Sequence, residues 1–273
     1  MIPKPDPEVR ARRVAVVSFL VTCVVLYLTA VLWWWERPLL AHPEVLGRAA
    51  AFTIALLGFL SAHEAGHWLT AWGHGIRLGP PLFLPVGVVM RLREIPGTRS
   101  GLLEMGAMGP LAGLCAIAVL LALRFTIGAP AEPAGVVLAA PPLWSLAGLA
   151  FTGALPAAPT ALDPLALAAC TGCLITVLNL IPWGQLDGGH VTAALFPSWA
   201  GVSSWGITAV LLLGGFWWPG WAVWAAVIHL VGTRHPLTAR RDRDPPCRRA
   251  RWIAVAAGVA FVLCFTPAPL RFG

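Results

Sequence analysis

Long apolar runs, separated by short polar stretches, constrain the fold of this chain more than any other feature. The runs cover residues 14–35, 49–72, 103–123, 165–181, 202–231 and 252–265. A helix of about 20 apolar residues crosses the hydrocarbon core of a bilayer. The run 202–231 is long enough for two short crossings, broken at Trp218–Pro219–Gly220. We therefore expect an all-α polytopic membrane protein with about seven transmembrane helices.

The composition agrees with this interpretation. Hydrophobic residues make up 58% of the chain and charged residues 11%, against roughly 25% charged residues in soluble domains. These values exclude an ordinary water-soluble globule and also a disordered chain. The net charge of +7 would suggest nucleic-acid binding in a soluble protein. Here the basic residues lie between apolar runs, where they act as topology signals facing anionic lipid, so we expect no nucleic-acid partner.

The arginines predict the orientation of the chain. Segment 135–158 is also apolar, but prolines interrupt it, which favours a loop or half-buried segment over a crossing. With that segment excluded, the basic residues of the N-terminal tail, of residues 77–99 and of residues 234–251 fall on one side. The positive-inside rule then places the N-terminus in the cytoplasm. Because arginine greatly outnumbers lysine, a feature of GC-rich bacterial genomes, we expect a bacterial inner-membrane protein.

The stretch between the second and third apolar runs, residues 76–101, has a different pattern. It mixes Gly and Pro with an alternating segment at residues 86–93. Alternation of this kind predicts a strand or hairpin. We expect a short membrane-associated β segment here, at the cytoplasmic interface.

Three polar residues lie inside the second apolar run: His63, Glu64 and His67. An ionisable group within a membrane span is costly unless paired or solvated, so each is a functional hypothesis. The spacing places both imidazoles on one helix face, one turn apart, where they can reach a single Zn²⁺. Glu64 can then act as general base toward water, which is the chemistry of the HExxH motif. Simple packing of two histidines would leave the carboxylate in lipid without a partner.

A catalytic zinc ion usually keeps three protein ligands, so a third ligand must come from elsewhere in the chain. The candidates by residue type are His74, His190, His229, Asp163 and Asp187. His74 would lie two turns, about 10 Å, beyond His67 and too far to share its metal. We expect His74 to be solvated at a helix end, and packing near the end of a late span explains His229.

Asp187 follows the fourth apolar run, in a segment that begins at Pro182 and is rich in glycine. Irregular backbone at membrane depth is tolerated around a polar cavity. If segment 135–158 does not cross, Asp187 and the two histidines lie in the same, cytoplasmic half of the membrane. Asp187 is therefore our candidate for the third ligand. Asn179, inside the fourth run, needs hydrogen-bond partners and can offer them to a substrate carbonyl.

Taken together, these residues resemble the site-2 protease family of intramembrane zinc metalloproteases. Residues 63–67 (HEAGH) match the first motif of the family, and residues 179–188 (NLIPWGQLDG) match its second motif. Residues 106–113 (GAMGPLAG) are similar to the start of the family's middle core helix. The resemblance implies that His63, His67 and Asp187 bind zinc and that Glu64 is the catalytic base. It also implies that Asn179 helps to hold the substrate strand or the oxyanion.

The resemblance also suggests a domain organisation. Residues 46–200 correspond to a catalytic core with three helices. Residues 1–45 would hold a cytoplasmic tail and a first anchor, and residues 201–273 further transmembrane helices with a basic cytoplasmic loop. We recognise no inserted PDZ domain and no CBS pair, and therefore expect a compact member of the family.

The predicted function is that of an intramembrane zinc metalloendopeptidase. It would hydrolyse peptide bonds in or near transmembrane helices of membrane protein substrates, as in regulated intramembrane proteolysis. The expected partners are a single-span membrane protein, whose helix must unwind and can pair with the β segment, and the lipid bilayer. One alternative is a catalytically inactive scaffold or binding protein of the same shape. Another is a transporter, because broken helices with ionisable groups also form ion sites, although no inverted repeat is visible.

Overall fold

The computed structural model of the chain describes residues 7–34, 43–84, 87–89, 96–128, 136–159, 163–198, 203–231 and 244–272. The helices in these ranges are α1 (Pro7–Trp33), α2 (Glu44–Gly73), α3 (Arg99–Ile127), α4 (Pro142–Thr152), α5 (Pro164–Leu180), α6 (Asp187–Leu195), α7 (Ser203–Gly214), α8 (Gly220–Val231) and α9 (Arg248–Cys264). The strands are β1 (Leu82–Leu84), β2 (Gly87–Val89), β3 (Val136–Leu138) and β4 (Leu270–Phe272). The architecture is predominantly helical, as the apolar runs predict.

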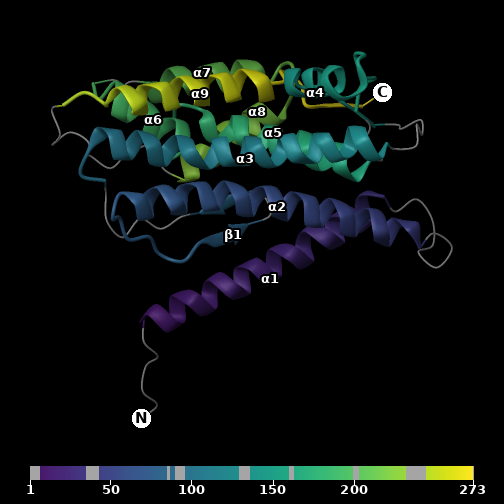
Figure 1. Cartoon of the computed structure of the whole chain (residues 1–273), viewed down its shortest axis with the longest axis horizontal. Helices are drawn as coiled ribbons and strands as arrows, with labels where there is room; N and C mark the ends of the chain where they lie inside the picture. The colour runs from purple at the N-terminus through teal and green to yellow at the C-terminus, as the bar shows by residue number, and fades with distance from the viewer. Residues whose placement is uncertain are drawn as a thin grey trace, which may run out of the picture.

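Helix α3 lies at the centre of the arrangement. Figure 1 shows α2 and α3 side by side along the long axis, with α1 on the outer side of α2. On its other side α3 contacts α4, α5, α6 and α9. Helix α9 falls outside the predicted catalytic core, yet it packs on α3 and α5. The domain boundaries at residues 45 and 200 therefore remain predictions.

Only part of the predicted span count is confirmed. Helices α1, α2 and α3 are long and apolar enough to cross a membrane, by length and composition. Helices α5 and α9 have 17 residues each, and α7 and α8 have 12 each. At 1.5 Å per residue, a helix like α7 extends about 18 Å, less than the roughly 30 Å of hydrocarbon. The four further crossings that we expected remain predictions.

Segment 135–158 contains strand β3 and the 11-residue helix α4. Of the two alternatives that the sequence favours over a crossing, a loop and a half-buried segment, the structure agrees with the second, because α4 buries Trp144 and Gly148 and leaves other residues exposed. Pro142 does not interrupt this helix, because it occupies the first turn, where its fixed φ favours helix and its missing N–H is not needed. Gly153, with φ of +72°, ends the helix. At about 17 Å, α4 alone is too short to cross a bilayer.

Two small antiparallel sheets complete the fold. Strands β1 and β2 form a hairpin in the register Leu82↔Val89. The N–H of Phe83 donates to Ser18 Oγ of α1 at 3.2 Å, and its ring meets that of Phe19 edge to face. Strand β3 pairs with β4 near the C-terminus. The two strands overlap the predicted β segment, of which residues 86 and 90–93 lie outside the described ranges. Its membrane association stays a prediction.

Large apolar side chains fill the core between α2, α3 and α5. Those that are fully buried include Leu56, Phe59, Leu60, Ile117, Leu121 and Val177. Gly172 of α5 lets the two helices approach, because a Cβ there would lie 3.2 Å from the Phe59 ring. This apolar core continues along α2 to the polar side chains of the second run, which are buried beside it.

Candidate metal centre

Helix α2 carries the first two candidate ligands. His63 and His67 are both 6% exposed, and their Nε2 atoms lie 3.1 Å apart. This proximity follows from the spacing of four residues, which stacks the side chains on one face of the helix. The apolar sequence around them keeps α2 continuous through both positions, from Glu44 to Gly73. The two imidazoles therefore face one point inside the protein.

Asp187 approaches the same point from α6, of which it is the first residue. Its Oδ2 lies 3.2 Å from Nε2 of His63, and its Oδ1 lies 3.4 Å from Nε2 of His67. One ligand atom from each of the three residues can be chosen so that all lie within 4.8 Å of one another. Within the described part of the chain, no other group of three such residues meets this criterion.

The donor chemistry of this group fits a metal ion. Nδ1 of His67 donates to the carbonyl oxygen of Met105 at 2.7 Å, so in the neutral ring Nε2 keeps its lone pair. A hydrogen bond of this kind orients many metal-binding histidines. Ligand atoms on a tetrahedral zinc ion stand about 3.3 Å apart, given Zn–N bonds of roughly 2.0–2.1 Å. The Nε2 atoms of His63 and His67 lie 3.1 Å apart, which is close to that value. Each also lies near one of the two carboxylate oxygens of Asp187, His63 at 3.2 Å from Oδ2 and His67 at 3.4 Å from Oδ1.

Glu64 differs from these three residues. Its side chain is buried, and Oε1 has no hydrogen-bond partner among the described residues. An unpartnered buried carboxylate is expensive to maintain. The arrangement therefore places an available proton acceptor directly after His63 in α2.

Glycines of α3 allow the helices to come this close. A Cβ at Gly109 would overlap the imidazole of His67, and one at Gly113 would lie 2.8 Å from the Phe59 ring and 3.3 Å from Nδ1 of His63. A Cβ at Gly106 would lie 2.7 Å from the carbonyl oxygen of Asp187. The glycine-rich stretch 106–113 therefore forms the wall against which both halves of the site pack.

Two further glycines set the position of Asp187. Helix α5 ends at Leu180, two residues before Pro182, and α6 begins at Asp187, five residues after that proline. A Cβ at Gly188 would overlap the carbonyl of Leu180, and one at Gly189 would overlap the carbonyls of Trp183 and Gly184. Only glycine allows the start of α6 to press against the end of α5 in this way.

Asn179 lies in the last turn of α5 and is half-buried. Its neighbour Leu180 contacts the start of α6 through its carbonyl group. The role of Asn179 in substrate binding stays a prediction.

The other sequence candidates lie apart from this group. Asp163 caps α5 by accepting from the N–H groups of Leu165 and Ala166, and it pairs with Arg124. His229 packs its ring against Trp183 and bonds the carbonyl of Ala225 at 2.8 Å. His74 is exposed, as expected, but it also contacts Glu104. His190 lies in α6, one turn after Asp187, and its Cβ faces Gly106.

Sequence reasoning from the residues did not find Met105 or the packing role of the α3 glycines. The signal for the glycines was present, because Gly109 and Gly113 have the spacing of a small-xxx-small motif for close helix packing. Met105 contributes only its backbone carbonyl. Since any residue offers that group, no pattern of residue types could have identified it.

Comparisons with known proteins agree with the motifs. Residues 51–215 match the family described as Peptidase family M50. A protein from Arabidopsis thaliana named "Probable zinc metalloprotease EGY2, chloroplastic" is 34% identical over 163 residues, which are 55% of this chain and 29% of that protein. "Probable zinc metalloprotease EGY1, chloroplastic", also from Arabidopsis thaliana, is 26% identical over 79% of this chain and 42% of that protein. The chain thus spans about three-tenths of the length of the first of these curated relatives.

One solved structure is similar over most of its length. The site-2 protease from Methanocaldococcus jannaschii is 16% identical and covers 88% of each chain, with a TM-score of 0.43. Because the TM-score is below 0.5, this structural similarity adds no support to the family assignment.

Proposed function

The chain belongs to peptidase family M50, and from this premise we propose that it is an intramembrane zinc metalloendopeptidase. It is an integral membrane protein with three helices suited to crossing a bilayer. Its substrates on this proposal are membrane proteins, cut in or near a transmembrane helix. The observation that carries the proposal is the convergence of His63, His67 and Asp187 on one buried point, with Glu64 beside them.

His63 and His67, through Nε2, and Asp187, through a carboxylate oxygen, would hold the zinc ion. When bound there, zinc supplies a Lewis acid and lowers the pKa of water to about 7. Asp187 contributes the negative charge that offsets part of the charge of the cation. Met105 keeps His67 in the tautomer whose Nε2 lone pair faces the site.

Glu64 is the proposed general base. Its free Oε1 accepts the proton of the water that attacks the peptide carbonyl and returns a proton to the leaving amine. Asn179, from the last turn of α5, would donate its side-chain N–H to the carbonyl oxygen as negative charge develops there. The proton-transfer step uses Oε1 of Glu64, which has no hydrogen-bond partner among the described residues.

The substrate must present an extended segment to these residues. The carbonyl groups of an intact helix are hydrogen-bonded, so the substrate helix has to unwind around the cleaved bond. We propose a single-span membrane protein as substrate, in a pathway of regulated intramembrane proteolysis. The β1–β2 hairpin, which follows α2 in the chain, would offer an edge for pairing with the unwound segment. We place the N-terminus in the cytoplasm and the protein in a bacterial inner membrane.

The test is to purify the protein in detergent, measure its zinc stoichiometry and assay cleavage of a transmembrane reporter by wild type and Glu64→Gln. We expect one zinc ion per chain in both proteins. Cleavage should fall about 100- to 10,000-fold in the variant, the range for loss of a general base. Absence of stoichiometric metal in the wild type would refute the proposal that the protein is a zinc protease. Tight zinc binding without any cleavage that depends on Glu64 would instead favour an inactive scaffold.

A further inference from the structure

The first two turns of α3 contact both of the helices that carry the proposed zinc ligands. They lie at the end of the molecule where α2 ends and α9 begins (Figure 1). Three polar side chains lie in these two turns, at the opposite end of α3 from Arg124: Arg99, Ser100 and Glu104. None of them belongs to the candidate metal centre, and the proposed mechanism leaves all of them unused.

Arg99 holds the far end of α6. Its Nε donates to the carbonyl oxygen of Ala194 at 2.7 Å, and its Nη2 donates to that of Leu195 at 3.0 Å. The last carbonyl groups of a helix lack partners within the helix, and a cation also interacts favourably with the dipole there. A planar guanidinium suits two neighbouring acceptors better than a single ammonium does. Arg99 therefore fixes the C-terminal end of the helix whose first residue is Asp187.

The other end of α6 rests on α3 as well. The carbonyl of Asp187 and the Cβ of His190 lie against Gly106, where a Cβ would be 2.7 and 2.8 Å from them. Arg99 and Gly106 are seven residues apart, which is about 10 Å along a helix. Two attachments at that separation determine how far α6 can slide or tilt along α3.

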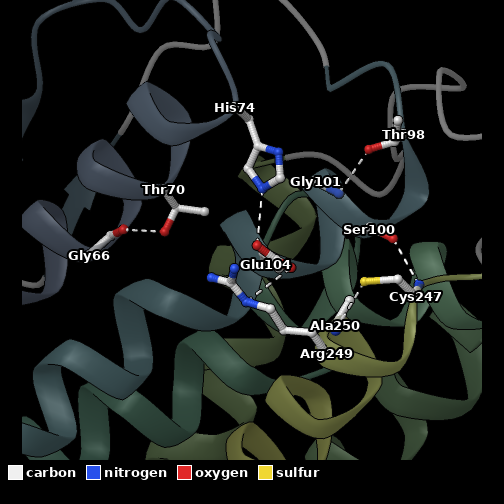
Figure 2. A network of polar contacts seen from close by, with 10 residues as sticks. All are labelled: Gly66, Thr70, His74, Thr98, Ser100, Gly101, Glu104, Cys247, Arg249 and Ala250. Carbon is white, nitrogen blue, oxygen red and sulfur yellow. Dashed lines mark hydrogen bonds and ion pairs between the residues drawn. The ribbon is translucent and has the colours of Figure 1, made fainter.

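Glu104 makes the equivalent attachment to α2. Figure 2 shows the imidazole of His74 directed at the carboxylate of Glu104, with Nε2 lying 3.0 Å from Oε2. The ring also lies beside Gly101, where a Cβ would be in ordinary van der Waals contact with Nδ1 of His74 at 3.5 Å. Glu104 is buried, and its other oxygen faces Nε of Arg249 in α9 at 3.9 Å. The carboxylate is thus held between two basic side chains (Figure 2).

The Glu104–His74 contact lies next to the contact between Met105 and His67. Glu104 directly precedes Met105, whose carbonyl accepts from Nδ1 of His67. His74 follows His67 by seven residues and ends α2, its N–H donating to the carbonyls of Thr70 and Ala71. Helix α2 is therefore attached to α3 at two positions, by His67 to Met105 and by His74 to Glu104. Helix α6 is likewise attached at two positions, Arg99 and Gly106.

We propose that Arg99 and the Glu104–His74 pair are positioning residues for the zinc centre. Arg99 holds α6 against α3, and the Glu104–His74 pair holds α2 against α3; we call these contacts the clamp. Together they place the carboxylate of Asp187 beside the two histidine rings. The inference rests on the proposed function, because it takes these three residues as zinc ligands. A clamp is needed because the ligands come from two helices, and sites of this kind tolerate displacements of only about 0.5 Å. The glycine contacts fix the start of α6, and the two bonds from Arg99 fix its C-terminal end.

The experiment compares Arg99→Ala, His74→Ala and the double variant with wild type in the full-length protein. Metal affinity is measured by competition between the protein and a zinc chelator, and ligand geometry by the visible absorption of the Co²⁺-loaded protein. Arg251→Ala is the matched control, because Arg251 is an exposed arginine in the first turn of α9. Thermal unfolding of the metal-free proteins separates positioning from general stability.

We expect each single substitution to weaken zinc binding about 10-fold and the double substitution to weaken it further, within the range known for residues behind metal ligands. The Co²⁺ spectrum should change in both single variants and stay as wild type in Arg251→Ala. Arg99→Lys should recover only part of the affinity, since one ammonium cannot match both carbonyl groups. Added guanidinium should restore affinity to Arg99→Ala and not to His74→Ala.

Three results would overturn the clamp. They are unchanged zinc affinity in both single variants, an unchanged Co²⁺ spectrum, or a lower melting temperature with no loss of metal affinity, which would make these residues structural. Failure of the proposed function gives a different result, because the wild-type protein itself would then bind no stoichiometric zinc.

Discussion

Asp163 and Asp187 are both acids at the start of a helix near the α3 core, yet their surroundings differ. Asp163 caps α5 with one oxygen and pairs with Arg124 through the other. That arginine also lies over the rings of Phe125 and Trp144 at 5.9 Å. Asp187 instead faces two imidazole nitrogens, with the unpartnered carboxylate of Glu64 on the same helix as those rings.

The comparison separates two uses of a buried charge. At Asp163 each carboxylate oxygen has a donor within the protein, which is how a structural acid is accommodated. At the metal centre several acceptors converge without enough donors for them, and a cation would balance that arrangement. Residue type and burial do not distinguish the two aspartates, but their partners do: backbone N–H groups and an arginine at Asp163, and two histidines at Asp187.

The largest effect should follow from Asp187→Ala. Loss of a ligand should weaken zinc binding more than about 100-fold, beyond the range for residues behind the ligands. Zinc should raise the melting temperature of wild type, because a ligand that binds only the folded state stabilises it, and should not raise that of the variant. Calorimetry with and without zinc measures both. Equal zinc affinity in the two proteins would mean that the third ligand lies elsewhere.

A smaller loss of zinc affinity is expected for Gly109→Ala. The added methyl group overlaps the ring of His67, so the imidazole or α3 must shift, and affinity should fall about 10- to 100-fold. Gly58→Ala in α2 is the control, because a Cβ there meets nothing within 4 Å. Zinc competition assays on both variants measure the difference. Equal affinities would show that α2 and α3 do not pack this closely.

The smallest change in zinc affinity is expected when Asp163 is substituted. Asp163→Ala removes the cap and the partner of Arg124, so unfolding should become easier by about 3 kcal/mol while zinc affinity stays as wild type. Asp163→Asn keeps an oxygen for the cap and should recover about 1 kcal/mol of that loss. Thermal unfolding and zinc titration of both variants test this. A marked loss of zinc binding in Asp163→Ala would remove the distinction between the two aspartates.

Several elements could be predicted from local sequence alone. The first three helices follow from unbroken apolar runs, and the shared helix face of His63 and His67 follows from their spacing. Helix α4 within segment 135–158 does not follow from the prolines, because proline has opposite effects inside a helix and at its first turn. The run 202–231 became α7 and α8, each of 12 residues, since Pro219 and Gly220 divide it near the middle.

The chemistry of this protein can be predicted from residue order alone: a helical membrane chain, a pair of histidines one turn apart with a neighbouring acid, and Asp187 as the candidate for the third ligand. These features are local, because they depend on hydropathy and helical period. The folded structure adds what residue types cannot specify: Asp187, the candidate chosen from the sequence, lies beside the histidines, a backbone carbonyl orients His67, and Arg99 and Glu104 attach both ligand helices to α3. Those contacts join residues far apart in the chain, and they form only when glycines let the helices approach closely.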